Sequence, residues 1–192
     1  MPEIELKFLV SETAVQGLSA LLTRLAGARP HRQQLLSQYF DTADFQLREA
    51  RLALRLRKAG RSWRVCLKSA GSGQGALQVR DEWEHPCRGE VDLSLFAATP
   101  LALVARAKTL HHDLVTVFVS DFQRRTWLLP RGAAGALEVA LDIGELRAQD
   151  RSAALVELEI ELKGDASIAS AFELARQIAR QVPLLPCSLS KA

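Results

Sequence analysis

Apolar and charged residues alternate along most of this 192-residue chain, and no other feature constrains its fold as strongly. Successive side chains of a β-strand point to opposite faces, so a period of two indicates strands with one apolar and one charged face. Near the end of the chain, for example, Val156, Leu158 and Ile160 alternate with glutamates. The pattern predicts eight or so antiparallel strands. The alternating segments are residues 3–10, 31–41, 51–59, 62–70, 76–85, 113–119, 121–129, 136–144 and 153–163.

Two amphipathic helices accompany these strands. The first is predicted to be capped by Thr13 and to end at Gly27. Its apolar stripe consists of Leu18, Leu21, Leu22 and Leu25. The second covers residues 166–182, and its apolar residues are Ile168, Phe172, Leu174, Ala175 and Ile178. A shorter helical patch covers residues 92–108 and is interrupted by a proline. Strands in the majority, with helices near the ends and middle, predict an α+β fold based on a barrel.

The charged faces of the strands are sorted by sign. Acidic side chains lie on the strands at the two ends of the chain, at Glu3, Glu5, Glu138, Asp142, Glu157, Glu159 and Glu161. Basic side chains dominate the strands between them, at Arg51, Arg55, Arg57, Arg64, Lys68 and Arg80. A sheet with one face in water also alternates, and it is the alternative interpretation. Such a face usually mixes both signs along each strand, whereas three glutamates at consecutive same-face positions repel one another. Both observations favour a closed sheet with its charged face inside.

A closed sheet of this kind would enclose a tunnel lined by both signs of charge. Carboxylate oxygens are ligands for hard cations such as Mg²⁺. Arg and Lys bind polyanions, and Arg adds bidentate hydrogen bonds to phosphate. The apolar faces of the strands would then point outward and be covered by the helices. The charge pattern therefore predicts a site that combines a divalent cation with a phosphate-bearing anion.

Composition excludes several other classes of protein. The chain is 48% hydrophobic and 24% charged, which is typical of a globular protein. Its net charge of +3 suits anionic partners without singling out nucleic acid. We expect no nucleic-acid partner, because the three tryptophans fall on the apolar parity of their strands, at Trp63, Trp83 and Trp127. No apolar run approaches the roughly 18 residues of a membrane span, so we expect no membrane association.

Cysteine usage indicates the compartment. Cys66, Cys87 and Cys187 are odd in number and widely spaced. This argues against a disulfide framework or a structural zinc site and favours a reducing environment. The first residues, Met1 to Glu3, also lack the basic and apolar regions of a signal peptide. We therefore expect a cytoplasmic protein.

The segment Glu3-Ile4-Glu5-Leu6-Lys7 resembles the Glu-x-Glu-x-Lys signature of the CYTH, or triphosphate tunnel metalloenzyme, superfamily. The superfamily includes inorganic triphosphatases, thiamine triphosphatases and class IV adenylyl cyclases. Matches recur in order over nearly the whole chain, at Tyr39-Phe40-Asp41-Thr42, Leu54-Arg55-Leu56-Arg57, Lys68, Glu82, Asp121-Phe122-Gln123-Arg124, Trp127, Leu141-Asp142, Glu157-Leu158-Glu159 and Ser190-Lys191. The similarity is greatest to the bacterial inorganic triphosphatases.

The resemblance implies an eight-stranded antiparallel closed barrel, with helices packed outside, and assigns roles to its inner residues. The metal-binding carboxylates would be Glu3, Glu5, Glu157 and Glu159, with Asp142 in support. The triphosphate would be bound by Lys7, Arg55, Arg57, Lys68, Arg80, Arg124 and Lys191. The residues expected to take part in catalysis are Glu5, Glu82, Arg55, Lys68 and Lys191. The implied cofactor is Mg²⁺ or Mn²⁺, with two ions in the tunnel.

The function implied is metal-dependent hydrolysis of inorganic triphosphate to pyrophosphate and phosphate. A class IV type of adenylyl cyclase and a thiamine triphosphatase are alternatives with the same fold. A non-catalytic polyphosphate-binding module is the alternative from another class. It would need the basic residues but not the carboxylates. Residues 1–192 are expected to form a single CYTH-like domain. Because many bacterial relatives continue into a helical CHAD domain after this point, truncation from such a longer protein is a second expectation.

Overall fold

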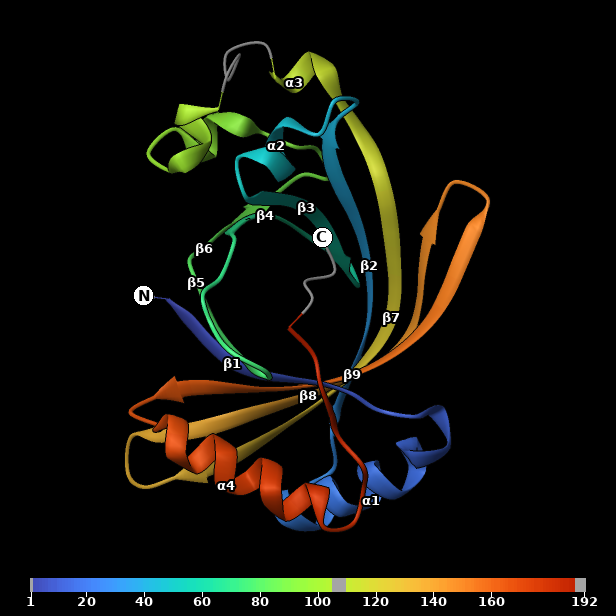
Figure 1. The fold of residues 1–192 in the computed structure, drawn as a ribbon, viewed down its shortest axis with the longest axis vertical. Helices are drawn as coiled ribbons and strands as arrows, with labels where there is room; N and C mark the ends of the chain where they lie inside the picture. The colour runs from blue at the N-terminus through green and yellow to red at the C-terminus, as the bar shows by residue number, and fades with distance from the viewer. Residues whose placement is uncertain (1, 105–109, 189–192) are drawn as a thin grey trace.

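The computed structural model describes residues 2–104 and 110–188 (Figure 1). Its strands are β1 (Glu3–Leu9), β2 (His31–Thr42), β3 (Leu52–Ala59), β4 (Ser62–Ser69), β5 (Leu77–Arg80), β6 (Glu82–Cys87), β7 (Leu114–Arg131), β8 (Gly135–Ala148), β9 (Arg151–Gly164) and β10 (Leu185–Pro186). Its helices are η1 (Glu12–Ala14), α1 (Val15–Ala26), α2 (Gln46–Glu49), η2 (Leu93–Phe96), η3 (Pro100–Leu103), α3 (Leu110–Asp113) and α4 (Ile168–Ala179), where η marks 3₁₀ turns.

All strand pairs are antiparallel, and the sheet that they form curls strongly (Figure 1). Within the described residues the sheet has ten strands, in the order β10-β1-β9-β8-β7-β2-β3-β4-β6, with β5 paired to β1. The expected antiparallel architecture is confirmed. The expected closed eight-stranded barrel is not, because the described parts of β6 and β1 form no ladder with each other. The fold is a curled, partly open barrel.

The break in the barrel lies at Asp81, inside the segment 76–85 that was predicted to be one strand. The Asp81 N–H donates to Ser69 Oγ at 3.1 Å, and the Asp81 carbonyl accepts from the Ser69 N–H at 3.0 Å. Because Asp81 is tied to the end of β4, the residues before it pair with β1 and those after it pair with β4. One segment thus reaches both edges of the sheet as two short strands.

Strand β7 departs from the prediction in the opposite direction. Two strands were expected, at residues 113–119 and 121–129, and a single strand of 18 residues is found. Its register with β2 shifts between Tyr39 and Phe40, a bulge that keeps both sides of the long strand paired. A turn at residues 132–134 follows β7, and β8 begins at Gly135.

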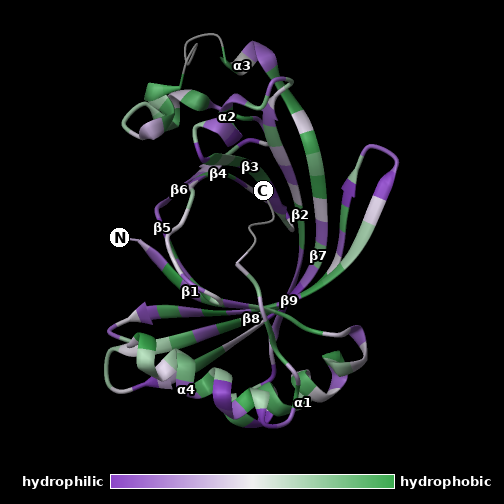
Figure 2. Cartoon of the chain, in the orientation of Figure 1, coloured by the Kyte–Doolittle hydropathy of each residue, from purple (hydrophilic) through white to green (hydrophobic). Residues whose placement is uncertain are grey.

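The larger hydrophobic core lies between the sheet and the helices α1 and α4, on the face away from the charged residues (Figure 2). It contains the predicted apolar residues Leu18, Leu21, Leu22, Leu174, Ala175 and Ile178. Helix α1 ends at Gly27, whose φ of 65° is the left-handed C-cap conformation that glycine allows. The predicted Thr13 cap is wrong. The 3₁₀ turn η1 precedes the helix, Ala14 holds the cap position, and the Thr13 hydroxyl bonds Ser11 instead.

A smaller core backs β3 and β4 on the opposite side of the barrel. Its buried residues are Leu47, Leu52, Leu54, Leu56, Val65, Leu67, Phe96, Leu101, Val104 and Leu110. Part of the helical patch predicted at 92–108 forms the turns η2 and η3 over this core, while 105–109 lie outside the described residues. Two tryptophans pack against it and Trp127 lies in the larger core, so the outward orientation expected for the tryptophans is confirmed. In the part of the chain that the structure describes, no helix has the length and apolar character needed to cross a membrane.

Candidate active site in the charged pocket

The inward face of the curled sheet encloses a pocket of about 240 Å³. Its walls come from β1, β2, β3, β4, β5, β6, β7 and β9, and all but two of the lining residues carry a charge. They are Glu3, Glu5, Lys7, Tyr39, Ala53, Arg55, Arg57, Lys68, Arg80, Glu82, Glu84, Arg124, Glu159, Glu161 and Lys163. The charged faces of the strands therefore point inward, and the alternative interpretation, a sheet with one face in water, is wrong.

Most of the residues predicted for the site reach this pocket. Those that line it are Glu3, Glu5, Lys7, Arg55, Arg57, Lys68, Arg80, Glu82, Arg124 and Glu159. Asp142 and Glu157 do not line it and lie behind its wall, where they are 1% and 3% exposed. Lys191 lies outside the described residues.

Three of the five predicted metal-binding carboxylates form one cluster. Asp142 and Glu157 face each other across the β8–β9 ladder, and Glu159 lies two residues further along β9. One oxygen from each residue lies within 4.8 Å of the others. Carboxylate oxygens gathered in this way suit a hard divalent cation, which takes several oxygen ligands at once. The donor set of this cluster therefore fits Mg²⁺ or Mn²⁺.

Positive side chains balance the charge of the cluster. Arg124 grips Asp142 with both arms of its guanidinium, Nε to Oδ1 and Nη2 to Oδ2, each at 2.7 Å. Its Nη2 also donates to Glu159 at 2.6 Å. Burial alone would lower the pKa of Arg124, but the charges of Glu159 and Asp142 outweigh it and hold the pKa well above its usual value. On the other side Lys7 Nζ lies 3.1 Å from Glu157, with both side chains almost fully buried.

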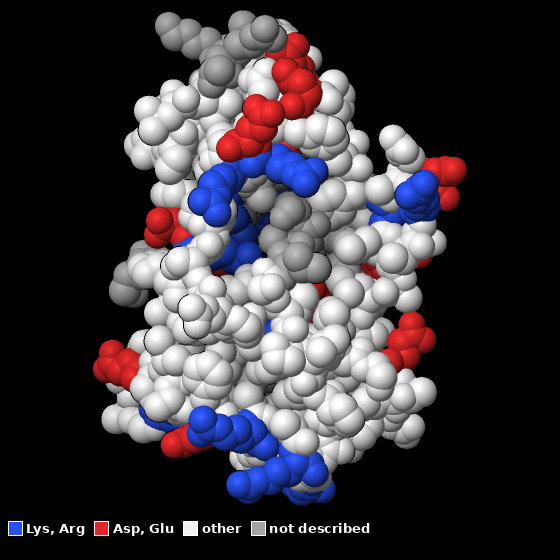
Figure 3. Space-filling model, viewed as in Figure 1, with Lys and Arg blue, Asp and Glu red and all other residues white. Residues whose placement is uncertain are grey.

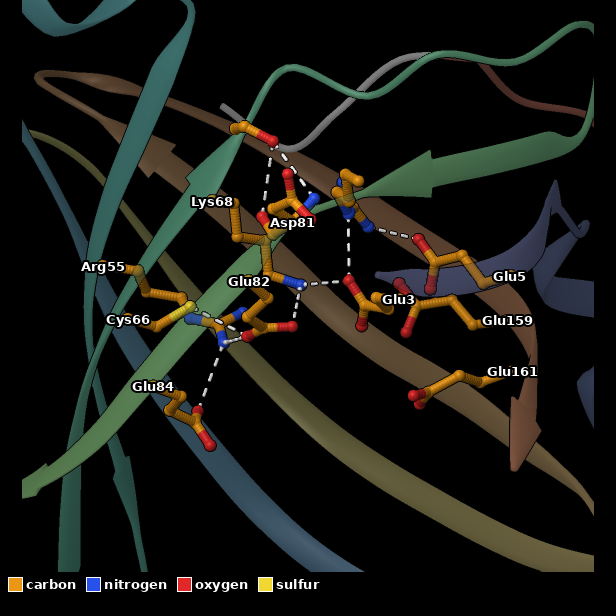
Figure 4. A network of polar contacts seen from close by, with 12 residues as sticks. Glu3, Glu5, Arg55, Cys66, Lys68, Asp81, Glu82, Glu84, Glu159 and Glu161 are labelled. Carbon is orange, nitrogen blue, oxygen red and sulfur yellow. Dashed lines mark hydrogen bonds and ion pairs between the residues drawn. The ribbon is translucent and has the colours of Figure 1, made fainter. Parts of the chain in front are cut away.

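The other two predicted metal ligands, on β1, contact cations instead (Figure 4). Glu3 accepts from Lys68 at 2.9 Å and from Arg80 at 3.0 Å, and Arg80 also pairs with Glu5. Burial and then the negative charge of Glu159 raise the pKa of Glu5 to about 7. Glu5 is therefore affected by the charge of Glu159, although its carboxylate pairs with Arg80.

The opposite wall, on β3, β4 and β6, is built around Glu82 (Figure 4). Its carboxylate lies 2.9 Å from Lys68 Nζ and 3.4 Å from Arg55 Nη2. It also accepts a hydrogen bond from the Cys66 thiol. Burial would raise the pKa of Glu82, but the charges of Lys68 and Arg55 outweigh it and lower the pKa to about 2. Glu82 is therefore an ionised residue that fixes the position of two cations.

Arg57 differs from the other cations of the pocket. In the described part of the chain it forms no ion pair, and its Nε donates to the Ser37 hydroxyl at 3.2 Å. Burial and the neighbouring charges of Arg55 and Arg124 lower the pKa of Arg57 to about 10. A guanidinium that is repelled by its neighbours and lacks a carboxylate partner is positioned to receive an anion.

Several residues in the pocket or next to it were not among the predicted site residues. Glu84 pairs with Arg55 at 3.6 Å and also with Arg64, and its position two residues after Glu82 was the available signal. Lys163 pairs with Glu161 at one rim of the pocket, and the two share a strand face. Ser37 carried no signal in the sequence, because a serine on a strand is common on either face.

A second cavity, of about 620 Å³, adjoins the pocket and shares Tyr39, Ala53, Lys68 and Arg80 with it. Its walls include the stacked rings of Tyr39 and Phe118, whose centroids lie 4.1 Å apart. The remaining walls combine apolar side chains with Arg48 and Arg51. Lys and Arg side chains gather around a hollow in the face of the molecule that Figure 3 presents. This larger, partly apolar cavity was not predicted.

Comparison with known proteins identifies the class of protein that this fold and pocket define. The profile of the CYTH domain matches residues 1–191, so the chain belongs to the CYTH family.

The individual relatives share no more than about a quarter of their residues with this chain. The chain is 25% identical over 195 residues to an inorganic triphosphatase of Haemophilus influenzae, with 100% of this chain and 53% of the relative aligned. It therefore spans about half the length of that curated relative. A Hippeastrum protein, studied as an adenylyl cyclase and reported to have a dominant triphosphatase activity, has a similar structure, with a TM-score of 0.67 and 19% identity over 98% of this chain and 92% of that one. A Bacillus halodurans protein described as an adenylate cyclase candidate gives a TM-score of 0.58 and 21% identity over 98% and 94%. At these identities the two structures support the fold alone.

Proposed function

We propose that the protein is a metal-dependent triphosphatase that hydrolyses inorganic triphosphate to pyrophosphate and phosphate in the charged pocket. One observation carries the proposal. A pocket of about 240 Å³ presents Arg and Lys side chains on one wall and a three-carboxylate cluster at the other, where Glu159 lines the pocket and Asp142 and Glu157 lie behind it. The first arrangement suits a chain of phosphates and the second a divalent cation. The name of the Haemophilus influenzae relative supports the same substrate.

The basic residues would bind and orient the phosphates. Arg55, Lys68 and Arg80 are held in place by carboxylates, so their donors are positioned before the substrate arrives. Arg57 would add a guanidinium that is paired with no carboxylate of the described residues. Positive charges fixed around the departing pyrophosphate stabilise the negative charge that develops on it. Lys7 and Arg124 complete the set, and Lys191 remains a prediction from the resemblance.

The acidic residues would hold the cofactor. Asp142, Glu157 and Glu159 would ligate Mg²⁺ or Mn²⁺, with Glu3 and Glu5 beside them for a second ion. A bound divalent cation supplies positive charge at the phosphate oxygens and lowers the pKa of water. Glu82 serves the reaction indirectly, because its contacts set the positions of Arg55 and Lys68.

The larger cavity favours a second candidate function. A triphosphate that carries an aromatic group, such as thiamine triphosphate or ATP, could place its phosphates near Lys68 and Arg80 and its ring near Tyr39 and Phe118. The reaction would then be hydrolysis of that compound or, for ATP, cyclisation. The non-catalytic polyphosphate-binding module would need the basic residues but no cation ligands, so the carboxylate cluster favours the triphosphatase over it. Three free cysteines are in keeping with a reducing compartment such as the cytoplasm.

A panel of phosphate-release assays tests the proposal. Inorganic triphosphate, thiamine triphosphate and ATP are compared with Mg²⁺ or Mn²⁺, with excess EDTA as the control, and cyclic AMP is measured in parallel. We expect metal-dependent phosphate release that is fastest with inorganic triphosphate. Full activity in EDTA would refute the metal requirement. Faster turnover of thiamine triphosphate or ATP would favour the second candidate function. Formation of cyclic AMP would show that the reaction is cyclisation rather than hydrolysis.

A further inference from the structure

Arg124, Asp142 and Glu157 form one row across three neighbouring strands. Arg124 pairs with Asp142 in the register of β7 and β8, and Asp142 pairs with Glu157 in the register of β8 and β9. Glu159 lies beside this row and accepts the third hydrogen bond of Arg124. A single guanidinium therefore contacts two of the three carboxylates that could ligate a cation.

This contact conflicts with an occupied cation site. Arg124 donates to oxygens of Asp142 and Glu159, and these two residues belong to the group whose oxygens lie within 4.8 Å of one another. A divalent cation among those oxygens would compete for the same lone pairs. It would also repel the adjacent guanidinium, and like charges at such distances are strongly unfavourable inside a protein.

Arg124 is the most exposed of the three side chains that meet in this contact. Asp142 is 2% exposed, Glu159 is 12% exposed and Arg124 is 20% exposed, and of these three Glu159 and Arg124 line the charged pocket. The guanidinium thus covers the carboxylates from the side of the pocket. Lys7, which contacts Glu157, is only 2% exposed.

We propose that Arg124 is the counter-ion of the carboxylate cluster in the metal-free protein. When a divalent cation binds to the cluster, the guanidinium leaves the carboxylates and turns toward the anion in the charged pocket. The inference rests on the proposed function for the identity of the cation site. It makes cation binding and phosphate binding cooperative, because the cation releases a guanidinium that then becomes available to the anion. Arg57 provides the contrast: it is paired with no carboxylate among the described residues and should be available to an anion whether or not the cation is bound.

The test measures binding of Mn²⁺ alone, by titration calorimetry, to the wild type, Arg124→Met and Arg57→Met. Met keeps much of the side-chain volume and removes the charge. Arg124→Met should bind Mn²⁺ about tenfold or more tightly than the wild type, since a competing positive charge in contact with the ligands is gone. Arg57→Met removes a guanidinium from the same pocket and should change the affinity by less than about threefold. Equal or weaker Mn²⁺ binding by Arg124→Met, or no binding by any variant, would overturn the inference.

A second variant covers the case in which Arg124→Met does not fold without metal. Arg124→Lys keeps the charge and loses the bidentate grip, so it should bind Mn²⁺ more tightly than the wild type and less tightly than Arg124→Met. If Arg124→Lys is no tighter than the wild type, the inference fails even without the Met variant.

The cooperativity is measured with pyrophosphate as the anionic probe. Saturating Mn²⁺ should tighten pyrophosphate binding more in the wild type than in Arg124→Met. Mn²⁺ and pyrophosphate also form a complex in solution, but its effect is the same for both proteins and cancels when the two changes in affinity are compared. An equal effect in both proteins would count against displacement. The proposed function fails separately, through absence of metal-dependent phosphate release by the wild type, and that result leaves the Mn²⁺ comparison intact.

Discussion

The two walls of the pocket hold their charges in different ways. On the β1, β8 and β9 side, Asp142 and Glu157 are withdrawn from water, and the larger core lies directly behind them. On the β3, β4 and β6 side, the Glu82 and Glu84 side chains are 21% and 29% exposed, and the smaller core supports the strands. On the first side, the acidic wall, the carboxylates are therefore withdrawn from water. On the second side, the basic wall, the carboxylates are more accessible, although Arg55 is buried.

The difference shows how a protein can hold both signs of charge in one small pocket. A buried carboxylate is tolerated only when a cation compensates it, so Glu157 is paired with Lys7, Asp142 with Arg124 and Glu5 with Arg80. On the basic wall, in contrast, Arg57 forms no ion pair with any of the described residues, although burial and two neighbouring guanidinium groups lower its pKa. The acidic wall is thus arranged for exchange of cations, and the basic wall for uptake of anions.

Removal of one acid from the buried cluster should have the largest effect. Glu159→Gln should lower the rate of phosphate release by about 100-fold or more, because a hard cation loses an anionic ligand. Glu5→Gln should also abolish turnover if Glu5 belongs to a second cation site. Glu161→Gln is the matched control, since Glu161 shares the strand face and pairs with Lys163 outside the cluster. An equal loss of activity in Glu161→Gln, or full activity of Glu159→Gln, would show that the carboxylate cluster has no special role compared with Glu161 at the rim of the pocket.

Neutralising the central acid of the basic wall should destabilise the fold. Glu82→Gln should lower the free energy of unfolding at pH 7 by about 1–3 kcal/mol, because Arg55 and Lys68 lose a charged hydrogen-bond acceptor. The pKa of Glu82, about 2, lies below its ordinary value of 4.5. Its stabilising effect is therefore complete above about pH 4.5 and is lost as the pH falls toward 2.

Denaturant unfolding between pH 7 and pH 2 checks both parts of this prediction. The difference in the free energy of unfolding between the wild type and Glu82→Gln should disappear as the pH falls from about 4.5 to 2. A difference between the two proteins that stays constant with pH would mean that Glu82 is not ionised in the folded state.

Arg57 should destabilise the ligand-free protein, in contrast to the paired cations. Arg57→Met should raise the melting temperature by about 2–4 °C, equivalent to about 1 kcal/mol, because repulsion from Arg55 and Arg124 is relieved. The same variant should show a smaller rise in melting temperature on addition of triphosphate and Mg²⁺, since less ligand binds the folded state. Arg55→Met should also shrink that rise. A lower melting temperature for ligand-free Arg57→Met would show that the Ser37 contact outweighs the repulsion.

A charge outside the pocket should have the smallest effect. Arg147 is 49% exposed and pairs with Asp121 and Glu145. Arg147→Met should change the free energy of unfolding by less than about 0.5 kcal/mol, and its triphosphate-induced shift should equal that of the wild type. Shifts reduced equally in Arg57→Met and Arg147→Met would indicate that the ligand responds to net charge rather than to the pocket.

Local patterns predicted the parts of the molecule that depend on residue spacing. Leu18, Leu21 and Leu22 recur at helical spacing, so the buried face of α1 could be read before its partner was known. The Thr13 cap could not, because the choice between a capped helix and a 3₁₀ turn depends on how β1 leads into α1. The interruption at Asp81 also escaped prediction, since its cause is a contact with Ser69 on another strand.

The sequence by itself determined which side chains share a face, because the period of a strand is set by its backbone. It therefore determined that Glu3, Glu5 and Lys7 point the same way, and that apolar residues remain for the helices to cover. Only the tertiary structure decided which charges meet. Asp142, Glu157 and Glu159 form a cluster while Glu3 and Glu5 contact Lys68 and Arg80, because the ladder registers bring certain residues together. Register and curvature depend on pairing between distant segments, and the charge pattern of one strand carries no record of them.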